Sequence, residues 1–189
     1  MDLYRLGITS ALLVFISTAV CFGQYRPLPG ATERPRRMHG TILDFTGNRH
    51  PRNRLFCPSL GRYRDVYVYL PPGYTPEHTY PLLIWLHGFS TDERVFACHL
   101  VPIVDELIAT GRIPPLIAVG PDGSVRSRFP LVRAGSWYVN SRHGRFGDYI
   151  CKDIVEFVER NFSVAAHPAA RAVAGFSMGG FGAFCLGME

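Results

Sequence analysis

The chain divides into short apolar runs and longer segments in which apolar residues recur at helical spacing. Residues 65–70 place valine and leucine on one face and tyrosine on the other, a period of two that predicts a strand. Residues 81–86 are apolar throughout, as expected for a central strand that is covered on both faces. The predicted strands cover residues 40–45, 65–70, 81–86, 116–119 and 172–174.

Between these strands the spacing of the apolar residues changes to that of helices. Ser90 and Glu93 form a capping box, which predicts the start of a helix, and apolar residues then recur every three or four positions. Gly111 is expected to end this helix, because glycine readily adopts the left-handed conformation that follows a helix C-terminus. The same spacing predicts a second helix around residues 149–158.

Strands and helices alternate after residue 80, and this order predicts a parallel sheet with helices on both faces. Ligands of such sheets bind at the carboxyl ends of the strands. His87, Pro121 and Ser177 each follow a predicted strand. We therefore expect these three turns to gather at one edge of the sheet.

The last predicted strand runs into a Gly-x-Ser-x-Gly sequence that is followed by a stretch of helix-forming residues. A strand, a sharp turn and a helix in this order are typical of a nucleophile elbow, which exposes the hydroxyl of Ser177. Gly175 and Gly179 lack the Cβ atoms that would collide where the strand and the helix approach each other. The N–H of Met178, at the helix N-terminus, is placed to stabilise negative charge on a substrate oxygen. The alternative interpretation is a glycine-rich turn before an ordinary helix.

Composition narrows the class of protein. A chain of 189 residues with 47% apolar and 13% aromatic residues suffices for a single folded domain, which we place at residues 39–189. The net charge of +5 comes from scattered arginines, with Lys152 as the single lysine. We attribute this charge to compositional bias, and we expect no nucleic-acid partner.

Residues 1–23 have the pattern of an export signal, with Arg5 before a mostly apolar stretch and small residues at the expected cleavage point after Gly23. The apolar stretch is short for a membrane span, although a retained anchor is the alternative. After cleavage no stable membrane span would remain, and the protein would be periplasmic or extracellular. Residues 24–38, rich in proline and arginine, are predicted to form a flexible lead-in.

Export changes how the cysteines are interpreted, because exported proteins form disulfides. Sequence spacing does not pair the four cysteines of the mature chain, and buried free thiols are an equally good interpretation. None of them has the spacing of a metal site. These residues are Cys57, Cys98, Cys151 and Cys185.

The segment from residue 124 to Gly147 is too long for a simple connection, and it is a candidate substrate-binding loop. It carries Trp137 and Tyr138, a combination with arginine that would suit an aromatic acid or a sugar ester. A solvated basic loop is the alternative. The arginines of this segment are Arg126, Arg128, Arg133, Arg142 and Arg145.

Several of these stretches resemble the esterase D or putative-esterase group of the α/β-hydrolase fold. This group includes S-formylglutathione hydrolases, feruloyl and acetylxylan esterases and mycolyltransferases. The resemblance implies a three-layer α/β/α sandwich whose C-terminal part is missing here. The matching stretches run in the family's order over residues 40–189, at residues 68–74, 82–88, 119–123, 144–149 and 174–180.

The resemblance also implies roles for individual residues. Ser177 would be the nucleophile, and the backbone N–H groups of Phe89 and Met178 would form the oxyanion hole. His87 and Gly88 would shape the oxyanion turn, with His87 serving as a structural residue rather than as the base. Such hydrolysis passes through an acyl-serine intermediate and requires no cofactor and no metal.

One part of the family pattern is absent from the chain. In this fold the triad follows the order Ser, then Asp or Glu, then His. All seven histidines precede Ser177, and the residues after it contain neither Asp nor His. We therefore expect a truncated chain, whose reading frame continues past Glu189 and supplies the acid and the base. Within the present chain His143 is the one candidate base.

The leading hypothesis is an exported serine esterase that acts on a small-molecule ester, present here as an incomplete chain. A serine peptidase of the same fold is an alternative, because the elbow does not specify the scissile bond. A second alternative is an inactive fragment or a pseudo-enzyme that binds a ligand without turnover. Export argues against the cytosolic S-formylglutathione hydrolase role.

Overall fold

The computed structural model describes residues 38–48, 50, 52–125 and 134–188. The predicted signal peptide lies outside the described residues, as does almost all of the predicted lead-in, so both remain predictions. Arg126, Arg128 and Arg133 of the candidate substrate loop also lie outside them. Within the described part of the chain, no helix combines the length and the apolar character needed to cross a membrane.

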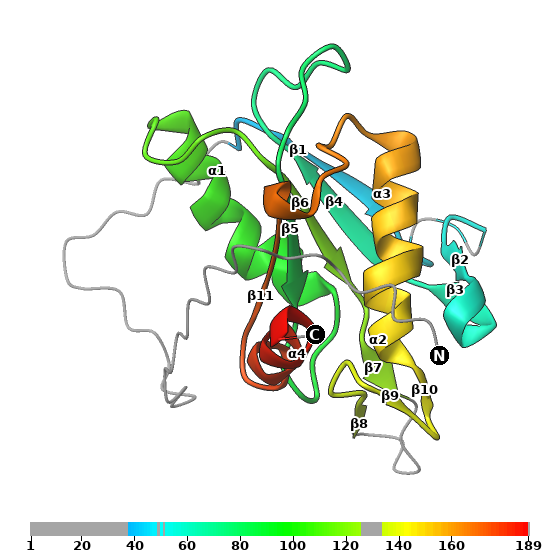
Figure 1. Ribbon diagram of the computed structural model, residues 1–189. Coiled ribbons are helices and arrows are strands. Elements are labelled where there is room, and N and C mark those ends of the chain that lie inside the picture. Colours follow the sequence, from blue (N-terminus) through cyan, green and yellow to red (C-terminus); the bar gives the residue numbers. More distant parts are fainter. Residues whose placement is uncertain (1–37, 49, 51, 126–133, 189) are drawn as a thin grey trace.

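The central sheet has five strands in the order β1-β4-β6-β5-β11 (Figure 1). The pairs β1/β4 and β4/β6 are antiparallel, whereas β6/β5 and β5/β11 are parallel. The parallel part therefore begins after residue 80, as the sequence predicts. The strands are β1 (Thr41–Phe45), β4 (Val66–Leu70), β5 (Leu82–Leu86), β6 (Ile117–Pro121) and β11 (Arg171–Gly175).

Three small hairpins lie outside the central sheet, and the sequence pattern does not predict them. Two of them belong to the candidate substrate loop, which is therefore partly ordered into strands. The hairpins are β2 (Leu55–Cys57) with β3 (Arg62–Arg64), β7 (Ser124–Val125) with β8 (Ala134–Gly135), and β9 (Asn140–Ser141) with β10 (Gly144–Arg145). A short 3₁₀ turn, η1 (Pro58–Leu60), joins β2 to β3.

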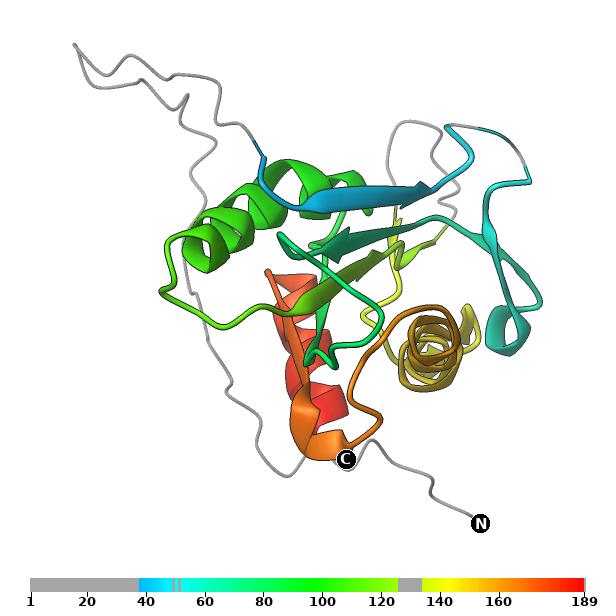
Figure 2. The same cartoon turned by 90° about the horizontal axis from the view of Figure 1, so that it is seen from above.

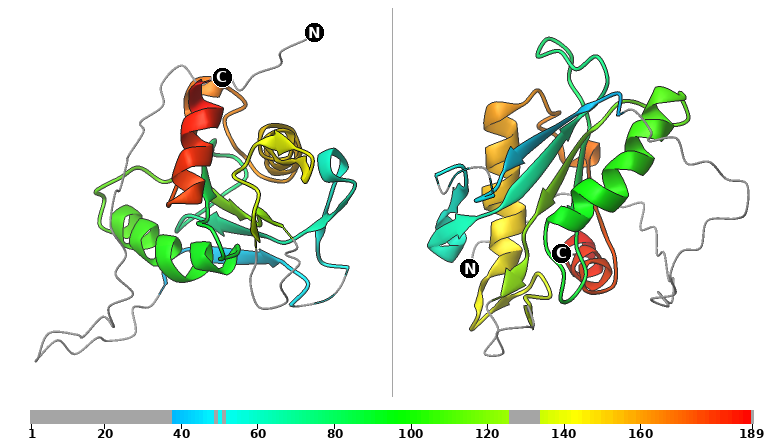
Figure 3. Two further views of the ribbon diagram at one scale, coloured as in Figure 1. Left: turned by 90° about the horizontal axis from the view of Figure 1, so that it is seen from below. Right: turned by 180° about the vertical axis from the view of Figure 1, so that it is seen from behind.

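The helices form the two outer layers of the sandwich. Helix α1 lies on one face of the sheet, and α3 and α4 lie on the other (Figures 2 and 3). This arrangement is the predicted three-layer α/β/α sandwich. The helical segments are η2 (Phe96–Leu100, a π-helical turn), α1 (Val101–Ala109), α2 (Phe146–Asp148), η3 (Tyr149–Ile154, also π-helical), α3 (Val155–Asn161), η4 (Pro168–Ala170, a 3₁₀ turn) and α4 (Met178–Met188).

Alternation along the strands divides the core in two, one part for each face. Val66 and Val68 of β4 are fully buried in the cluster that contains α3 and α4. Tyr69 of the same strand is buried with Phe96 and Val104 in the smaller cluster under α1. Each fully buried side chain of this size contributes about 1.5–3 kcal/mol relative to an exposed one. The predicted two-faced pattern of this strand is therefore confirmed.

The predicted capping box at Ser90 is wrong. Ser90 is exposed and has a left-handed backbone with a φ of 63°, and helical structure begins only at Arg94. Asp92 takes the capping role instead, because its carboxylate accepts the Arg94 N–H at 3.2 Å. Thr91 ties the intervening turn to Gly88 O at 2.8 Å, so the residues after β5 form a loop before the helix can start. Glu93 is thereby buried inside the molecule.

Cys57, Cys98 and Cys185 are free thiols among the described residues, and the cysteines differ in exposure. Cys57 is fully buried, which raises the pKa of its thiol to about 12 and makes it unreactive at neutral pH. Cys98 is exposed, contrary to the buried position that its apolar neighbours suggest, because it lies on the outer side of η2. Cys151 and Cys185 are partly buried.

Candidate active site

The predicted nucleophile Ser177 occupies a single sharp turn between β11 and α4. Its φ is 53°, a left-handed conformation that residues with a Cβ seldom adopt, and its side chain is exposed. The turn is closed by the Gly179 N–H, which donates to Phe176 O at 2.8 Å. Strained, exposed geometry at the carboxyl end of a parallel strand is characteristic of a nucleophile elbow.

Glycine is required on both sides of the elbow because the turn packs directly against the end of β5. A Cβ on Gly179 would lie 1.9 Å from Leu86 O, and a Cβ on Gly175 would lie 2.4 Å from the Gly179 carbonyl carbon. The Phe176 N–H donates to the same Leu86 O at 3.1 Å. The elbow and the residues that follow β5 are therefore neighbours, as their positions after adjacent parallel strands predict.

The predicted oxyanion turn, residues 87–89, follows β5 at this edge of the sheet. A Cβ on Gly88 would contact the Phe176 ring at 3.1 Å, so the turn and the elbow are packed together. The Phe89 ring and the Met178 sulfur both lie against Gly135, at 2.9 Å and 2.0 Å from where a Cβ there would be. The structure thus brings together the two residues whose N–H groups are the predicted oxyanion donors.

His87 is buried inside the oxyanion turn with both ring nitrogens engaged. Nε2 accepts the Gly123 N–H at 2.8 Å, and Nδ1 lies 2.8 Å from Gly88 O. Because a carbonyl oxygen can only accept, the ring is neutral and carries its proton on Nδ1. A ring held in this way is not free to take a proton from Ser177. The geometry agrees with the structural role that the resemblance implies for His87.

A buried ion pair lies behind His87. Arg64 Nη2 is 3.0 Å from Asp122 Oδ2, with side chains that are 9% and 5% exposed. Burial raises the pKa of the Asp122 carboxyl, but the charge of the Arg64 guanidinium and the hydrogen bond from the Ser124 N–H outweigh burial and lower this pKa to about 2. Asp122 is therefore ionised throughout the physiological range. Sequence reasoning missed Arg64, although its place two residues before the buried Val66, on the same face, marks it as pointing inward.

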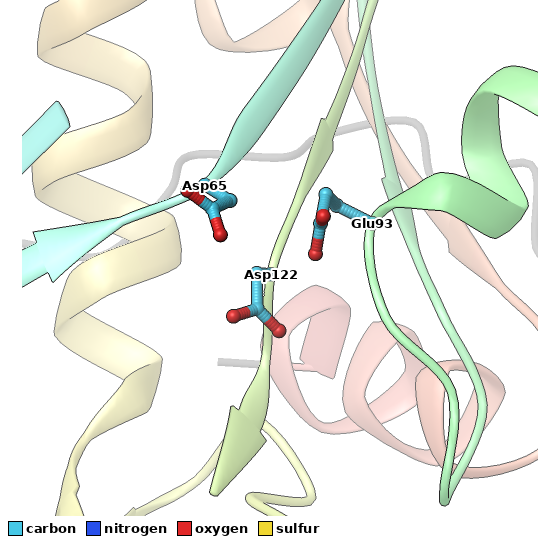
Figure 4. A group of neighbouring side chains, drawn as sticks. All are labelled: Asp65, Glu93 and Asp122. Carbon is cyan, nitrogen blue, oxygen red and sulfur yellow. The ribbon is translucent and has the colours of Figure 1, made fainter. Parts of the chain in front are cut away.

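Asp122 also belongs to a group of three carboxylates with Asp65 and Glu93, drawn in Figure 4. One oxygen from each lies within 4.8 Å of the others, and this is the one cluster of metal-ligating type among the described residues. A cation would compete there with two arginines, because Arg54 pairs with Asp65 at 2.6 Å just as Arg64 pairs with Asp122. Two of the three negative charges are already compensated.

Glu93 is the carboxylate of this group that forms no ion pair with an arginine among the described residues. It is 4% exposed, and its Oε2 has no hydrogen-bond partner within the described part of the chain. Burial, reinforced by the charge of Asp122, raises the pKa of Glu93 to about 7. Glu93 therefore keeps its proton at mildly acidic pH, and its charge changes near neutrality.

Three aromatic side chains form an exposed patch beside the elbow. Trp137 lies edge-to-face on Phe181 of α4 with ring centroids 5.5 Å apart, and its centroid is 6.4 Å from that of Phe89. Phe89, Trp137 and Phe181 are 46%, 45% and 47% exposed. The candidate substrate residue Trp137 is therefore at the surface near Ser177, and Phe89 and Phe181 extend the patch.

Tyr138, the other candidate substrate residue, is not at this surface. It is fully buried, and its hydroxyl donates to His87 O at 3.1 Å. Its ring fills the space beside Gly123 and Gly182, where a Cβ would lie 2.2 Å and 2.7 Å from it. Tyr138 therefore holds the oxyanion turn from the interior of the protein, and its buried side chain cannot contact a substrate.

No histidine among the described residues hydrogen-bonds to Ser177. His143, the candidate base within the chain, is exposed on the turn between β9 and β10, where its Nε2 accepts from Arg142 at 3.4 Å. His167 and His50 accept N–H groups in local turns, from Ala169 and Arg52. The described residues therefore assemble the elbow and the oxyanion turn without a histidine that is hydrogen-bonded to Ser177.

The strand order, the elbow after β11 and the oxyanion turn after β5 together define an α/β-hydrolase fold. The chain belongs to the putative esterase family, whose model matches residues 57–189. The resemblance predicted from the motifs is thus confirmed.

Two curated relatives illustrate this membership. Esterase Rv1288 of Mycobacterium tuberculosis is 36% identical over 136 residues, which cover 69% of this chain and 27% of that protein. The endo-1,4-beta-xylanase/feruloyl esterase of Xylanibacter ruminicola is 30% identical over 149 residues, which cover 75% of this chain and 19% of that protein.

A solved structure agrees with the assignment. A ferulic acid esterase superposes with a TM-score of 0.64 at 26% identity, covering 78% of this chain and 53% of that one. The chain thus spans about half the length of that solved esterase and about a quarter of the length of the mycobacterial relative.

Proposed function

We propose that this protein is an exported serine esterase that hydrolyses a carboxylic ester through an acyl-serine intermediate. The observation that carries the proposal is the geometry of Ser177, exposed on a left-handed elbow whose glycines pack against the end of β5. The neighbouring oxyanion turn and the family membership support it.

The chemistry begins with attack of Ser177 Oγ on the ester carbonyl carbon, while the hydroxyl proton passes to a base. The carbonyl π electrons move to oxygen, and the N–H groups of Phe89 and Met178 stabilise the resulting oxyanion. Each such donor contributes about 10²- to 10³-fold to the rate in enzymes where it has been removed. Collapse of the intermediate breaks the bond to the alkoxide, which takes the proton from the base and leaves as the alcohol. Water then attacks the acyl-serine, releases the carboxylic acid and restores the Ser177 hydroxyl.

Attack by Ser177 requires a base and an acid that orients it. A serine hydroxyl is a weak nucleophile until a neutral imidazole accepts its proton. Among the described residues, His87 is engaged on both ring nitrogens, and no histidine bonds to Ser177. His143 is the candidate base within the chain, and if it takes the proton of Ser177, His143→Ala would abolish hydrolysis.

The aromatic patch of Phe89, Trp137 and Phe181 favours substrates with a planar or apolar acyl group. Rings of this kind stack on one another, and exposed rings beside a nucleophile offer such a surface. One solved structure that this chain resembles is a ferulic acid esterase, and one relative is an endo-1,4-beta-xylanase/feruloyl esterase. A small-molecule ester of a plant-type phenolic acid is therefore the first substrate to try.

The proposed export rests on residues 1–23 and can be tested by finding the protein's N-terminus after secretion. N-terminal sequencing that begins at Gln24 would support it. Recovery of the uncleaved chain from the cytoplasm would overturn it.

Ser177→Ala tests the activity in the full-length protein. Hydrolysis should fall by more than about 10³-fold, because the nucleophile is lost while the fold remains. Ser163→Ala is a matched control, because Ser163 lies beside Tyr80 at the start of β5 and donates to Pro76 O, whereas Ser177 follows the opposite end of the parallel strand β11. Activity of Ser177→Ala within a few-fold of the parent would remove the assignment. Matched ester and amide substrates distinguish an esterase from a serine peptidase.

The ligand-binding alternative makes a different prediction for a fluorophosphonate, which labels only an activated serine. In that reaction the Oγ–P bond forms, the P–F bond breaks and fluoride leaves. Binding of an aromatic ester without labelling of Ser177 and without turnover would favour a pseudo-enzyme.

A further inference from the structure

A buried arginine from outside the central sheet holds the loop that follows β6. Arg64 lies at the end of β3, in the hairpin that Figure 1 shows away from α4. Its Nη2 donates to Asp122 O at 2.8 Å and to Ser124 O at 2.6 Å, and its Nε donates to Asp122 O at 3.1 Å. One guanidinium therefore joins two backbone carbonyls and, through the ion pair, a carboxylate.

The position of this guanidinium is itself fixed. It lies over the buried ring of Phe146 at 5.5 Å, and Arg64 is 8% exposed. An arginine stacked on a ring and bonded through a planar fork has little freedom to move. Arg64 thus sets where residues 122–124 lie.

The same loop holds the oxyanion turn through a single histidine. Gly123 lies between the two residues whose carbonyls Arg64 binds, and its N–H donates to His87 Nε2 at 2.8 Å. His87 Nδ1 in turn binds Gly88 O at 2.8 Å. The peptide unit that begins with Gly88 O ends with the N–H of Phe89, the proposed oxyanion donor. Because a peptide unit is planar, the hydrogen bond between His87 Nδ1 and Gly88 O also sets the direction of the Phe89 N–H.

We propose that Arg64 is a positioning residue for the oxyanion hole, acting through residues 122–124 and His87 on the Phe89 peptide. Arg64 touches no substrate in this scheme, and the inference rests on the proposed function. Two further contacts hold the turn independently, the Tyr138 hydroxyl on His87 O and the Thr91 hydroxyl on Gly88 O. Loss of Arg64 should therefore misalign the donor rather than unfold the turn.

Two substitutions of Arg64 and a matched control test this role in the full-length protein. Arg64→Lys keeps the positive charge, but a lysine cannot span two carbonyls and a carboxylate. Arg64→Met removes both the charge and the hydrogen-bond donors. We expect kcat for an aromatic ester to fall about 10-fold in the first and about 100-fold in the second, with KM changed less than about 2-fold.

The control is Arg171, whose guanidinium also pairs with a carboxylate, that of Glu159. It begins β11, at the end of the strand opposite Ser177, and its side chain is 14% exposed. Arg171→Lys and Arg171→Met should lower thermal stability without lowering kcat. Comparing the Arg64 and Arg171 variants separates the general effect of losing a buried arginine from the effect of losing the contacts of Arg64 with residues 122–124.

Amide hydrogen exchange supplies a readout that does not depend on turnover. In Arg64→Lys, peptides covering residues 87–91 should exchange faster, while those covering residues 175–181 keep the parent rate. Arg171→Lys should leave residues 87–91 unchanged. If kcat and the exchange of residues 87–91 in Arg64→Lys match those of Arg171→Lys, the proposal is overturned.

Failure of the proposed function and failure of the positioning role of Arg64 would give different results. A parent that neither hydrolyses esters nor reacts with a fluorophosphonate removes the proposed function. Faster exchange of residues 87–91 in Arg64→Lys would still support the coupling of Arg64 to the turn in that case. An active parent with an unaltered Arg64→Met variant removes the positioning role alone.

Discussion

The elbow and the oxyanion turn lie side by side at the ends of β11 and β5, yet they are held in different ways. The elbow depends on contacts within a few residues and on two glycines that allow it to press against Leu86. The oxyanion turn is held by buried polar groups far away in the sequence, including Gly123 and Tyr138. The elbow is therefore fixed by local steric contacts, and the oxyanion turn by hydrogen bonds between residues that are distant in the sequence.

The difference affects how each region should respond to change. The elbow, residues 175–179, contains no titratable group, so steric substitutions are the way to disrupt it. The turn is backed by Asp122, which is ionised, and by Glu93, whose charge changes near neutral pH. Changes in hydrogen bonding or in pH should therefore act on the turn first.

The largest effect is expected from Gly179→Ala. The added Cβ would lie 1.9 Å from Leu86 O, a backbone atom that cannot rotate away. We expect a loss of more than about 4 kcal/mol in the free energy of unfolding, the range of severe steric mutations. Gly180→Ala is the matched control, because its Cβ would meet nothing closer than 3.4 Å. Chemical denaturation measures both, and equal stabilities would show that the elbow is not sterically fixed.

A smaller effect, confined to activity, is expected at Phe89. Phe89→Pro deletes the N–H that we assign to the oxyanion hole, so kcat should fall about 10²- to 10³-fold. Phe89→Leu keeps the N–H and should cost only a few-fold through the aromatic patch. Steady-state kinetics on the two variants, with circular dichroism to check the fold, provides the measurement. Equal rates would mean that the donor lies elsewhere.

The smallest effect is a pH dependence of stability from Glu93. Its pKa is raised from 4.5 to about 7 in the folded protein, mainly by burial. Between these values the unfolded chain loses the proton while the folded protein keeps it. Stability therefore falls as pH rises from about 4.5 to about 7, by at most about 3 kcal/mol.

Glu93→Gln should remove this dependence. Denaturant unfolding at pH 5 and pH 8 gives the comparison, and the parent should lose more stability than the variant across that interval. Identical pH profiles for the two proteins would exclude Glu93 as their source. The elbow glycines do not titrate, so they cannot produce this pH dependence. The experiment therefore reports on the oxyanion turn and not on the elbow.

Much of the scaffold could be predicted because its signals are local. The period-two pattern of residues 65–70 and the apolar run of residues 81–86 give strands whose observed bounds differ by a single residue. The capping box at Ser90 failed because the turn after β5 uses those residues for contacts with Gly88 before the helix begins. A capping signal is weak when tertiary contacts compete for the same residues.

The candidate site was predictable to a different degree in each of its parts. Ser177 and its flanking glycines are a contiguous motif, so their arrangement follows from steric rules alone. Trp137 and Tyr138 are adjacent and equally aromatic, yet Trp137 is 45% exposed and Tyr138 fully buried. Adjacent residues in an irregular loop have no fixed period, and the sequence cannot assign them to the surface or the interior.

The sequence by itself determined the alternation of strands and helices, the elbow and the family, because each depends on side-chain period or on a short motif with a steric cause. Only the tertiary structure decided that Arg64, 58 residues before Asp122, reaches its backbone. It also decided that Asp65, Glu93 and Asp122 converge. Such contacts depend on the register of the sheet and on which loops meet at its edge, and the energy of a buried charge is set by partners that no local pattern encodes.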